Sequence, residues 1–221
     1  VNDGKSIYSD KENAYIYTYD GSGRIWNLMA VDGKLYFLVG SMFMEAKMLG
    51  ADYWGGRLFA YDLETGETER IDSLGGYVPM LQVMMTEDYY FISSRNGNGE
   101  DLVRLPREDP DTASGYRLAV MDERLGLGSQ FTLANDGWIY YTGRNEEDAP
   151  AVYRVPADAQ GDDESQLLVY NTKGYPFGNP VVVDDCLYVS SYNLSDASYS
   201  ILRMDREAYD KDTSVVWDVS N

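Results

Sequence analysis

Short apolar segments alternate with polar turns along the whole chain, and one version of this pattern occurs four times. Each occurrence begins with a turn containing Asp or Gly and continues into an aromatic or aliphatic segment, at residues 31–37, 86–91, 135–141 and 183–189. Asp and Gly tolerate the positive φ of a tight hairpin, so each segment is predicted to form two antiparallel strands. Aligned on Tyr36, Tyr90, Tyr140 and Tyr188, the segments recur every ~50 residues, a blade-like spacing.

A second segment follows each hairpin and alternates apolar and polar residues with a period of two, as a third strand would. These segments are residues 57–62, 102–106, 152–156 and 201–205. A more polar fourth strand is expected near 68–74, 116–122, 165–171 and 214–220, and no helical periodicity is found. Four strands in each repeat predict an all-β chain, a β-propeller of four-stranded antiparallel blades.

The predicted organisation is a single propeller domain, 1–221, with blades at about 24–76, 77–125, 126–174 and 175–221. Residues 1–23 repeat parts of the hairpin and of the third strand, but they are too few for a complete blade. They are interpreted as a half-blade. This half-blade either pairs with C-terminal strands to close the ring or forms the edge of a larger propeller.

Residues 136–145 read Asp-Gly-Trp-Ile-Tyr-Tyr-Thr-Gly-Arg-Asn, and Val-Tyr-Arg-Val follows at 152–155. This combination resembles the YWTD-type propeller repeat and related bacterial secreted propeller domains of unknown function. The other three blades keep the aromatic strand without the Thr-Asn ending, and residues 58–67 look equally like a third strand of quinoprotein-type propellers. The resemblance covers residues 24–220. It implies an extracellular or cell-envelope binding and scaffold module, and it transfers no catalytic residue.

The chain is strongly acidic, with 37 Asp and Glu against 18 Lys and Arg and a net charge of −19. Nucleic acids and anionic membranes require a basic surface, so neither is expected as a partner. No apolar segment approaches the roughly 18 residues of a membrane-spanning helix, so membrane insertion is not expected either. Because the sequence begins with Val1, we expect either that a targeting segment has been removed or that the sequence is part of a longer chain.

The chain contains no histidine, which excludes Ser-His-Asp triads and histidine-ligated metal sites. The single cysteine, Cys186, lies in a predicted strand and is expected to be a small buried hydrophobic residue. No cofactor is expected, and the chain is predicted not to be an enzyme. A carboxylate-dependent carbohydrate-active enzyme remains an alternative because acids are plentiful, although no Asp-box repeat and no acid in a strongly apolar context is found.

Three acidic or oxygen-rich segments have some features of a calcium site. Residues 96–101 place oxygen ligands at alternate positions, but the downstream Glu of a calcium loop is missing. A polar turn is therefore the expected structure for this segment. Residues 146–148 and 162–164 have the same two interpretations, and no metal site is predicted.

In a propeller, the loops after the second strand and between blades open on one face, and function concentrates in such loops. The longest of these loops, residues 40–56, is rich in Met and aromatic residues, which suits either a contact surface or a cap on its own blade. Arg95 and Arg144, both just after a second strand, bind either a carboxylate or sugar ligand or an acid of their own loop. The candidate ligand-binding residues are Trp26, Tyr53, Trp54, Tyr77, Arg95, Arg144, Tyr175, Phe177 and Tyr192.

The sequence thus predicts a non-catalytic extracellular or cell-surface module that binds a protein, peptide or glycan at this loop face. A purely structural spacer in a multidomain surface protein is a second alternative.

Overall fold

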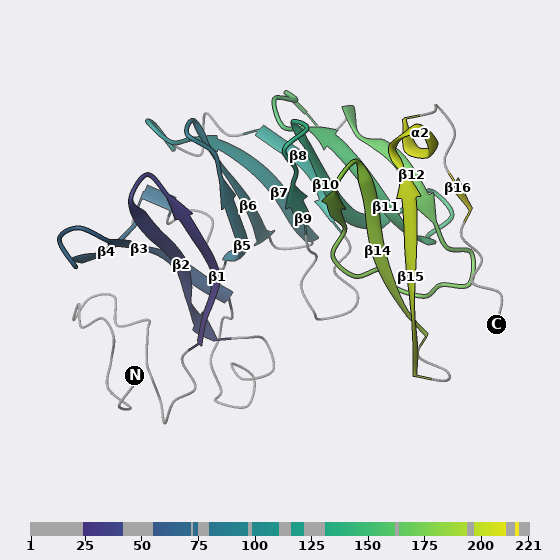
Figure 1. The fold of residues 1–221 in the computed structure, drawn as a ribbon, viewed down its shortest axis with the longest axis horizontal. Helices are drawn as coiled ribbons and strands as arrows, with labels where there is room; N and C mark the ends of the chain where they lie inside the picture. The colour runs from purple at the N-terminus through teal and green to yellow at the C-terminus, as the bar shows by residue number, and fades with distance from the viewer. Residues whose placement is uncertain are drawn as a thin grey trace. The chain divides into compact units, whose positions relative to one another are not determined.

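The structure is a computed structural model, and it describes residues 24–41, 55–71, 73–74, 80–96, 99–110, 116–121, 131–161, 164–193, 197–210 and 215–216 (Figure 1). The predicted half-blade, residues 1–23, lies outside these ranges. The chain forms two compact units, one of Val1–Arg95 with Leu105–Gly115 and one of Asn96–Arg104 with Tyr116–Asn221. The single-domain organisation stays a prediction.

The described strands form antiparallel meanders in chain order. The first predicted repeat contains β1 (Arg24–Val31), β2 (Lys34–Ser41), β3 (Gly55–Asp62) and β4 (Thr68–Arg70). The second contains β5 (Met80–Met85), β6 (Tyr89–Asn96), β7 (Gly99–Pro106) and β8 (Tyr116–Met121). The third contains β9 (Phe131–Leu133), β10 (Trp138–Arg144), β11 (Pro150–Pro156) and β12 (Gln166–Tyr170), and the fourth contains β13 (Val181–Val183), β14 (Cys186–Asn193) and β15 (Ser198–Asp205).

The order of strands within the sheets follows the order of the chain. The largest sheet runs β1-β2-β3-β5-β6-β7-β8 with β4 beside β3, the second contains β9 to β12 in sequence, and the third runs β13-β14-β15. These successive antiparallel meanders confirm the predicted fold class, an all-β chain built of β-propeller blades. In the described part of the chain, no helix is long and apolar enough to cross a membrane.

A backbone hydrogen bond recurs at the hairpin turn of every repeat. In three of the four repeats a turn residue takes positive φ, as Gly33 does at 74°, Gly137 at 83° and Asp185 at 61°, which explains the Asp and Gly residues there. The last turn residue then accepts a bond from the residue that follows the third strand. The four donor and acceptor pairs are Leu63 to Gly33 at 3.1 Å, Arg107 to Asp88 at 2.8 Å, Ala157 to Gly137 at 2.9 Å and Arg206 to Asp185 at 2.9 Å.

This recurring bond corrects the repeat alignment in one place. Tyr36 and Tyr140 each stand three positions after the bonded turn residue, and Phe91, rather than Tyr90, stands there in the second repeat. The two neighbouring aromatic residues at 90 and 91 made both alignments compatible with the sequence, and only the hairpin register distinguishes them.

The last repeat differs from the prediction of a fourth strand at 214–220. The strand found there, β16 (Val215–Val216), pairs in parallel with Val169 and Tyr170 of β12, not with β15. Between β15 and β16 the chain forms a short helix, α2 (Arg206–Tyr209). The helix is a single turn, which is too short to produce a helical period in the sequence. Tyr209 of α2 is buried with its ring edge against Tyr140, 6.1 Å between centroids, and this packing directs the chain toward the sheet of β12.

The core of the second unit lies between two sheets. Leu187, Val189 and Met204 of β14 and β15 pack with Tyr140 and Val152 of β10 and β11. Because side chains alternate along a strand, the neighbouring residues of β14 and β15 lie on the opposite face of their sheet. Cys186 is buried, as expected from the sequence.

Candidate ligand-binding surface

Four of the predicted ligand-binding residues are not placed by the structure. Tyr53, Trp54 and Tyr77 lie outside the described residues, as does most of the 40–56 loop. Arg95 belongs to β6, but its side chain is not described. The ligand-binding roles of these residues remain predictions.

Trp26 has a structural contact that accounts for its position. Its indole Nε1 donates to the carbonyl oxygen of Leu81 at 2.9 Å, linking β1 to β5. Its ring lies against Gly56, where a Cβ atom would be only 2.9 Å from the ring carbons. A ligand at Trp26 would therefore compete with a bond between two strands.

Arg144 at the end of β10 bonds within its own loop. Its guanidinium donates to the backbone carbonyl of Asp148 and lies 3.8 Å from the Asp148 carboxylate. Asn145 closes the same loop, because its Oδ1 accepts from the backbone N–H groups of Glu147 and Ala149. The acids at 146–148 therefore belong to a polar turn, and no group of three Cys, Asp or Glu residues in the described ranges is placed to hold a metal ion.

Three of the predicted residues, Tyr175, Phe177 and Tyr192, lie on two neighbouring backbone segments, although the Phe177 side chain faces the core and Tyr192 the opposite side. The segment that carries Tyr175 and Phe177 runs antiparallel to the end of β14: Phe177 pairs with Ser191, and the backbone N–H of Tyr192 donates to Pro176 at 3.3 Å. Phe177 packs on the core between the sheets, whereas Tyr175 is half-buried. The end of β14 is thus the part of the predicted loop face that the structure assembles.

Tyr192 forms an aromatic pair with Tyr199 across β14 and β15. The ring centroids are 4.6 Å apart, and Tyr199 is 75% exposed. Ile201, two residues further along β15, is 74% exposed on the same face of the sheet. We call this face, with Val181, Val183, Tyr188, Tyr192, Tyr199 and Ile201, the outer face. The sequence analysis did not select Tyr199 or Ile201. Tyr199 precedes the expected third strand, 201–205, and Ile201 is its first residue, although the period-two alternation in β15 places both on one face of the strand.

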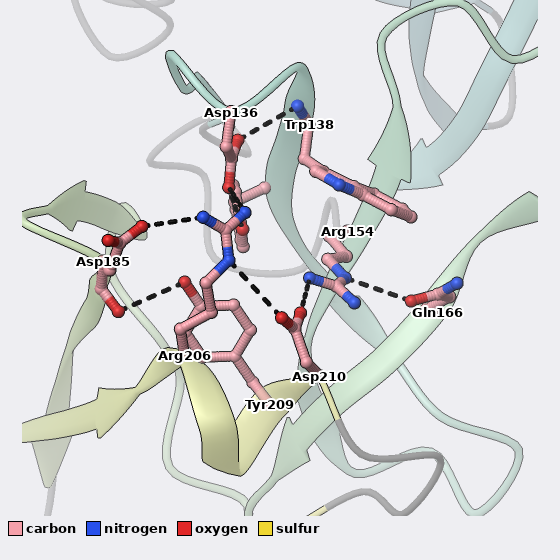
Figure 2. Close-up of polar contacts among 9 residues, drawn as sticks. Asp136, Trp138, Arg154, Gln166, Asp185, Arg206, Tyr209 and Asp210 are labelled. Carbon is pink, nitrogen blue, oxygen red and sulfur yellow. Dashed lines mark hydrogen bonds and ion pairs between the residues drawn. The ribbon is translucent and has the colours of Figure 1, made fainter.

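A polar network lies at the other end of this sheet (Figure 2). The Arg206 guanidinium contacts Asp136 at 3.2 Å and Asp185 at 2.7 Å, and its Nε lies 3.4 Å from Asp210. Asp136 also accepts from the Tyr140 hydroxyl at 2.8 Å and from the Trp138 backbone N–H at 3.1 Å. We call this the Arg206 network.

Arg154 extends the Arg206 network into the protein. It donates to Asp210 at 2.6 Å and to Gln166 at 3.0 Å, and its guanidinium lies 4.2 Å from the centre of the Trp138 ring. Burial, together with the hydrogen bond to Asp136 and the charge of that residue, raises the pKa of Tyr140 far above its ordinary value. The acids of this network thus serve as acceptors for arginine and tyrosine.

The first unit contains a second network at equivalent positions. Arg107, which follows β7 as Arg206 follows β15, contacts Asp32 at 3.1 Å and the Tyr36 hydroxyl at 3.4 Å. It also donates to the carbonyls of Thr86 and Glu87. Because the same Asp, Tyr and Arg positions recur in two repeats, these residues are explained by blade packing rather than by chemistry at one site.

Comparison with known proteins identifies no family for the chain. No protein-family model matches, and no curated protein matches. Among solved structures, the chain is similar to the tricorn protease, with 14% identity, a TM-score of 0.43, and 80% of this chain and 17% of that chain covered. It is also similar to the GH43_1 enzyme from Xanthomonas citri complexed with xylose, with 10% identity, a TM-score of 0.43 and coverages of 83% and 71%.

A third similar structure is a chain of the nidogen/laminin complex, with 9% identity, a TM-score of 0.40 and coverages of 86% and 82%. The chain thus spans less than a fifth of the tricorn protease but most of the other two. At these TM-scores, the similarities assign neither an activity nor a ligand to the chain.

Proposed function

We propose that this chain is a non-catalytic, extracellular or cell-envelope binding module that takes a protein, peptide or glycan on the Tyr192–Tyr199 pair. The observation that carries the proposal is the exposure of Tyr199, whose ring is paired with that of Tyr192 at the end of β14. An exposed aromatic pair on a regular strand is held in place before a ligand arrives.

Tyrosine is well suited to this role. It presents a large apolar ring and a hydroxyl, and it loses little conformational entropy because it has only two side-chain torsions. The net charge of −19 favours a neutral or basic ligand over an acidic one, since like charges repel during the encounter.

The enzymatic alternative requires two carboxylates placed on either side of a glycosidic bond. Asp136, a mostly buried acid of the Arg206 network, is instead bonded to Arg206, to Tyr140 and to a backbone N–H. These contacts use the Asp136 carboxylate as an acceptor within the protein and account for it without a substrate. We therefore favour binding over hydrolysis.

The test is a thermal-shift screen against peptides and soluble glycans, followed by calorimetry on any ligand found, since a ligand that binds only the folded state raises its melting temperature. Tyr199→Ala should weaken binding by about tenfold or more. The control is Val183→Ala on the same outer face, beside the β13–β14 turn, which should bind as the wild type does.

Unchanged affinity in folded Tyr199→Ala would contradict the assigned site. A cooperative melt without a shift for any ligand would favour the structural spacer. Hydrolysis of a model glycoside, lost on a single Asp→Asn or Glu→Gln change, would establish the enzymatic alternative.

A further inference from the structure

β15 is the edge of its sheet in the part of the chain that the structure describes. The third strands of the other repeats each have a fourth strand beside them: β4 pairs with β3, β8 with β7 and β12 with β11. The candidate fourth strand of the last repeat, β16, pairs with β12 instead. An edge strand of this kind presents a row of backbone N–H and C=O groups to another strand.

β15 also lacks most of the features that protect edges. It is eight residues long and pairs with β14 in continuous register, without a bulge, from Cys186↔Asp205 to Asn193↔Ser198. Its outer-face residues between the two ends are Tyr199, Ile201 and Arg203, of which only one is charged. Long, regular and apolar edges are the ones that pair with other chains.

We propose that β15 pairs antiparallel with β15 of a second copy of this chain. The two copies would be related by a two-fold axis that passes between their Ile201 residues, which we call the Ile201 axis. Outer-face residues must oppose outer-face residues, because side chains alternate between the two faces of a strand. With the axis at Ile201, this residue opposes Ile201 of the second copy, and Tyr199 opposes Arg203 of the second copy. The two-fold axis forms the Tyr–Arg pair twice.

The neighbouring registers match less well. An axis at Leu202 would set Ile201 against Arg203 and Tyr199 against Asp205, so that each apolar side chain would face a charge. An axis at Ser200 would pair Tyr199 with Ile201 but leave Arg203 opposite Ala197. Cross-strand pairs of apolar residues and of a cation with an aromatic ring stabilise a sheet, so the Ile201 axis is preferred.

The Arg203 side chain is 55% exposed, and it would turn from its partners on the β14 side to stack on a tyrosine of the second copy. The guanidinium lies 2.7 Å from the Asp205 carboxylate and 3.1 Å from the Cys186 sulfur. Hydrogen bonds use the edge of the guanidinium, whereas stacking on an aromatic ring uses its flat face. Arg154, at the equivalent position of β11, already combines both kinds of contact, with Asp210 and with Trp138.

The inference goes beyond the proposed function, and the two can fail separately. Pairing would join the sheets of two copies through β15, and the Tyr192–Tyr199 pairs of both copies would lie on the same side of the joined sheet. If the chain bound a ligand but stayed monomeric, the proposed function would stand and the proposed dimer would be refuted.

The experiment is sedimentation velocity over about a hundredfold range of concentration, which brackets a dissociation constant over roughly 3 kcal/mol of binding free energy. The mass should rise from 24.9 kDa toward twice this value. Ile201→Lys should keep the chain monomeric, because it places two like charges against each other at the axis. Val183→Lys, which makes the same change on β13 at the other edge of the sheet, should dimerise like the wild type.

Hydrogen exchange of the β15 amides that point away from β14 keeps the test independent of any folding defect in a variant. The exchange of these amides in the wild type should slow as the concentration rises. A monomer at every concentration would overturn the proposal. Protection of these outward-pointing amides in the monomer would overturn it too, because it would mean that another segment of the same chain covers the edge, and so would equal loss of dimer in the two lysine variants.

Discussion

Arg154 and Arg203 occupy the same position in successive third strands, opposite Tyr140 and Tyr188, but their surroundings differ. The side chain of Arg154 is 7% exposed and is bonded to Asp210 and Gln166. The side chain of Arg203 is 55% exposed, and its partner Asp205 is 62% exposed. The sequence gives no sign of this difference, because it arises from the sheet and the helix that cover one arginine and not the other.

We predict that Arg154→Ala lowers the free energy of unfolding by about 3 kcal/mol, because it leaves acceptors without their donor and a cavity beside Trp138. Arg203→Ala should have no measurable effect on the monomer, because exposed ion pairs contribute little. Urea unfolding at a concentration low enough to exclude association compares the two variants. Equal losses would show that burial does not decide the value of these arginines.

The Arg206 network shows what local patterns cannot predict. Asp136 was recognised as a hairpin turn residue, which it is, but its partner Arg206 is 70 residues away in the chain. The pairing depends on how one sheet packs on the next, and no spacing rule within a repeat contains that information. Trp26 is similar: an aromatic residue near a loop suggested ligand binding, whereas its partner is a backbone carbonyl of the following repeat.

Among the elements, the hairpin turns were the most predictable. In the two-residue turns both residues take positive φ, and few residue types do so at low cost, so Asp32-Gly33 and Asp184-Asp185 mark turns directly. The fourth strands are short and polar and carry a weaker signal. The strand expected at 214–220 was assigned to the wrong sheet, because its pairing with β12 is a contact between distant segments that the local pattern does not contain.

The β13–β14 turn allows a prediction at the scale of the element. Asp184 and Asp185 have φ of 49° and 61°, and Asn is preferred over Asp in turns of this kind. Asp184→Asn should therefore stabilise the chain by about 0.5 kcal/mol, and it also removes a negative charge next to Asp185. Asp185→Asn should stabilise it less than Asp184→Asn does, because it also removes the exposed ion pair between Asp185 and Arg206 at 2.7 Å. Thermal unfolding of the two single variants would decide, and a larger gain from Asp185→Asn would refute this account of the turn.

For the molecule as a whole, the fold class followed from the sequence because blade strands and turns are local, repeated features. The binding surface followed only in part. Tyr192 and its neighbours could be predicted because they stand at a strand end. The exposed residues of β15 could not, because β15 is a third strand and the third strands of the other repeats each have a fourth strand beside them. Exposure depends on which sheets find a neighbour, and that is a property of the assembled chain.

Tyrosine is the commonest aromatic residue of the chain, and several tyrosines are buried in ways that affect the whole molecule. Burial is the main reason why the pKa values of Tyr90, Tyr140, Tyr153 and Tyr209 are raised above the ordinary 10.0. Above pH 10 the unfolded chain loses these protons while the folded chain keeps them. The folded state then binds more protons, so stability falls as the pH rises, and this contribution is fully present below pH 10.

The melting temperature should therefore decline steeply above about pH 10, where unfolded tyrosine ionises. Tyr140→Phe should lower stability at pH 8, because the hydroxyl bond to Asp136 is lost, and should also make the alkaline decline shallower, because one proton fewer is retained on folding. Tyr199→Phe, at an exposed position, is the matched control and should leave the stability at pH 8 unchanged. If Tyr140→Phe lost stability equally at pH 8 and at pH 11, the buried hydroxyl would contribute a hydrogen bond but no part of the alkaline sensitivity, and other groups would have to account for it.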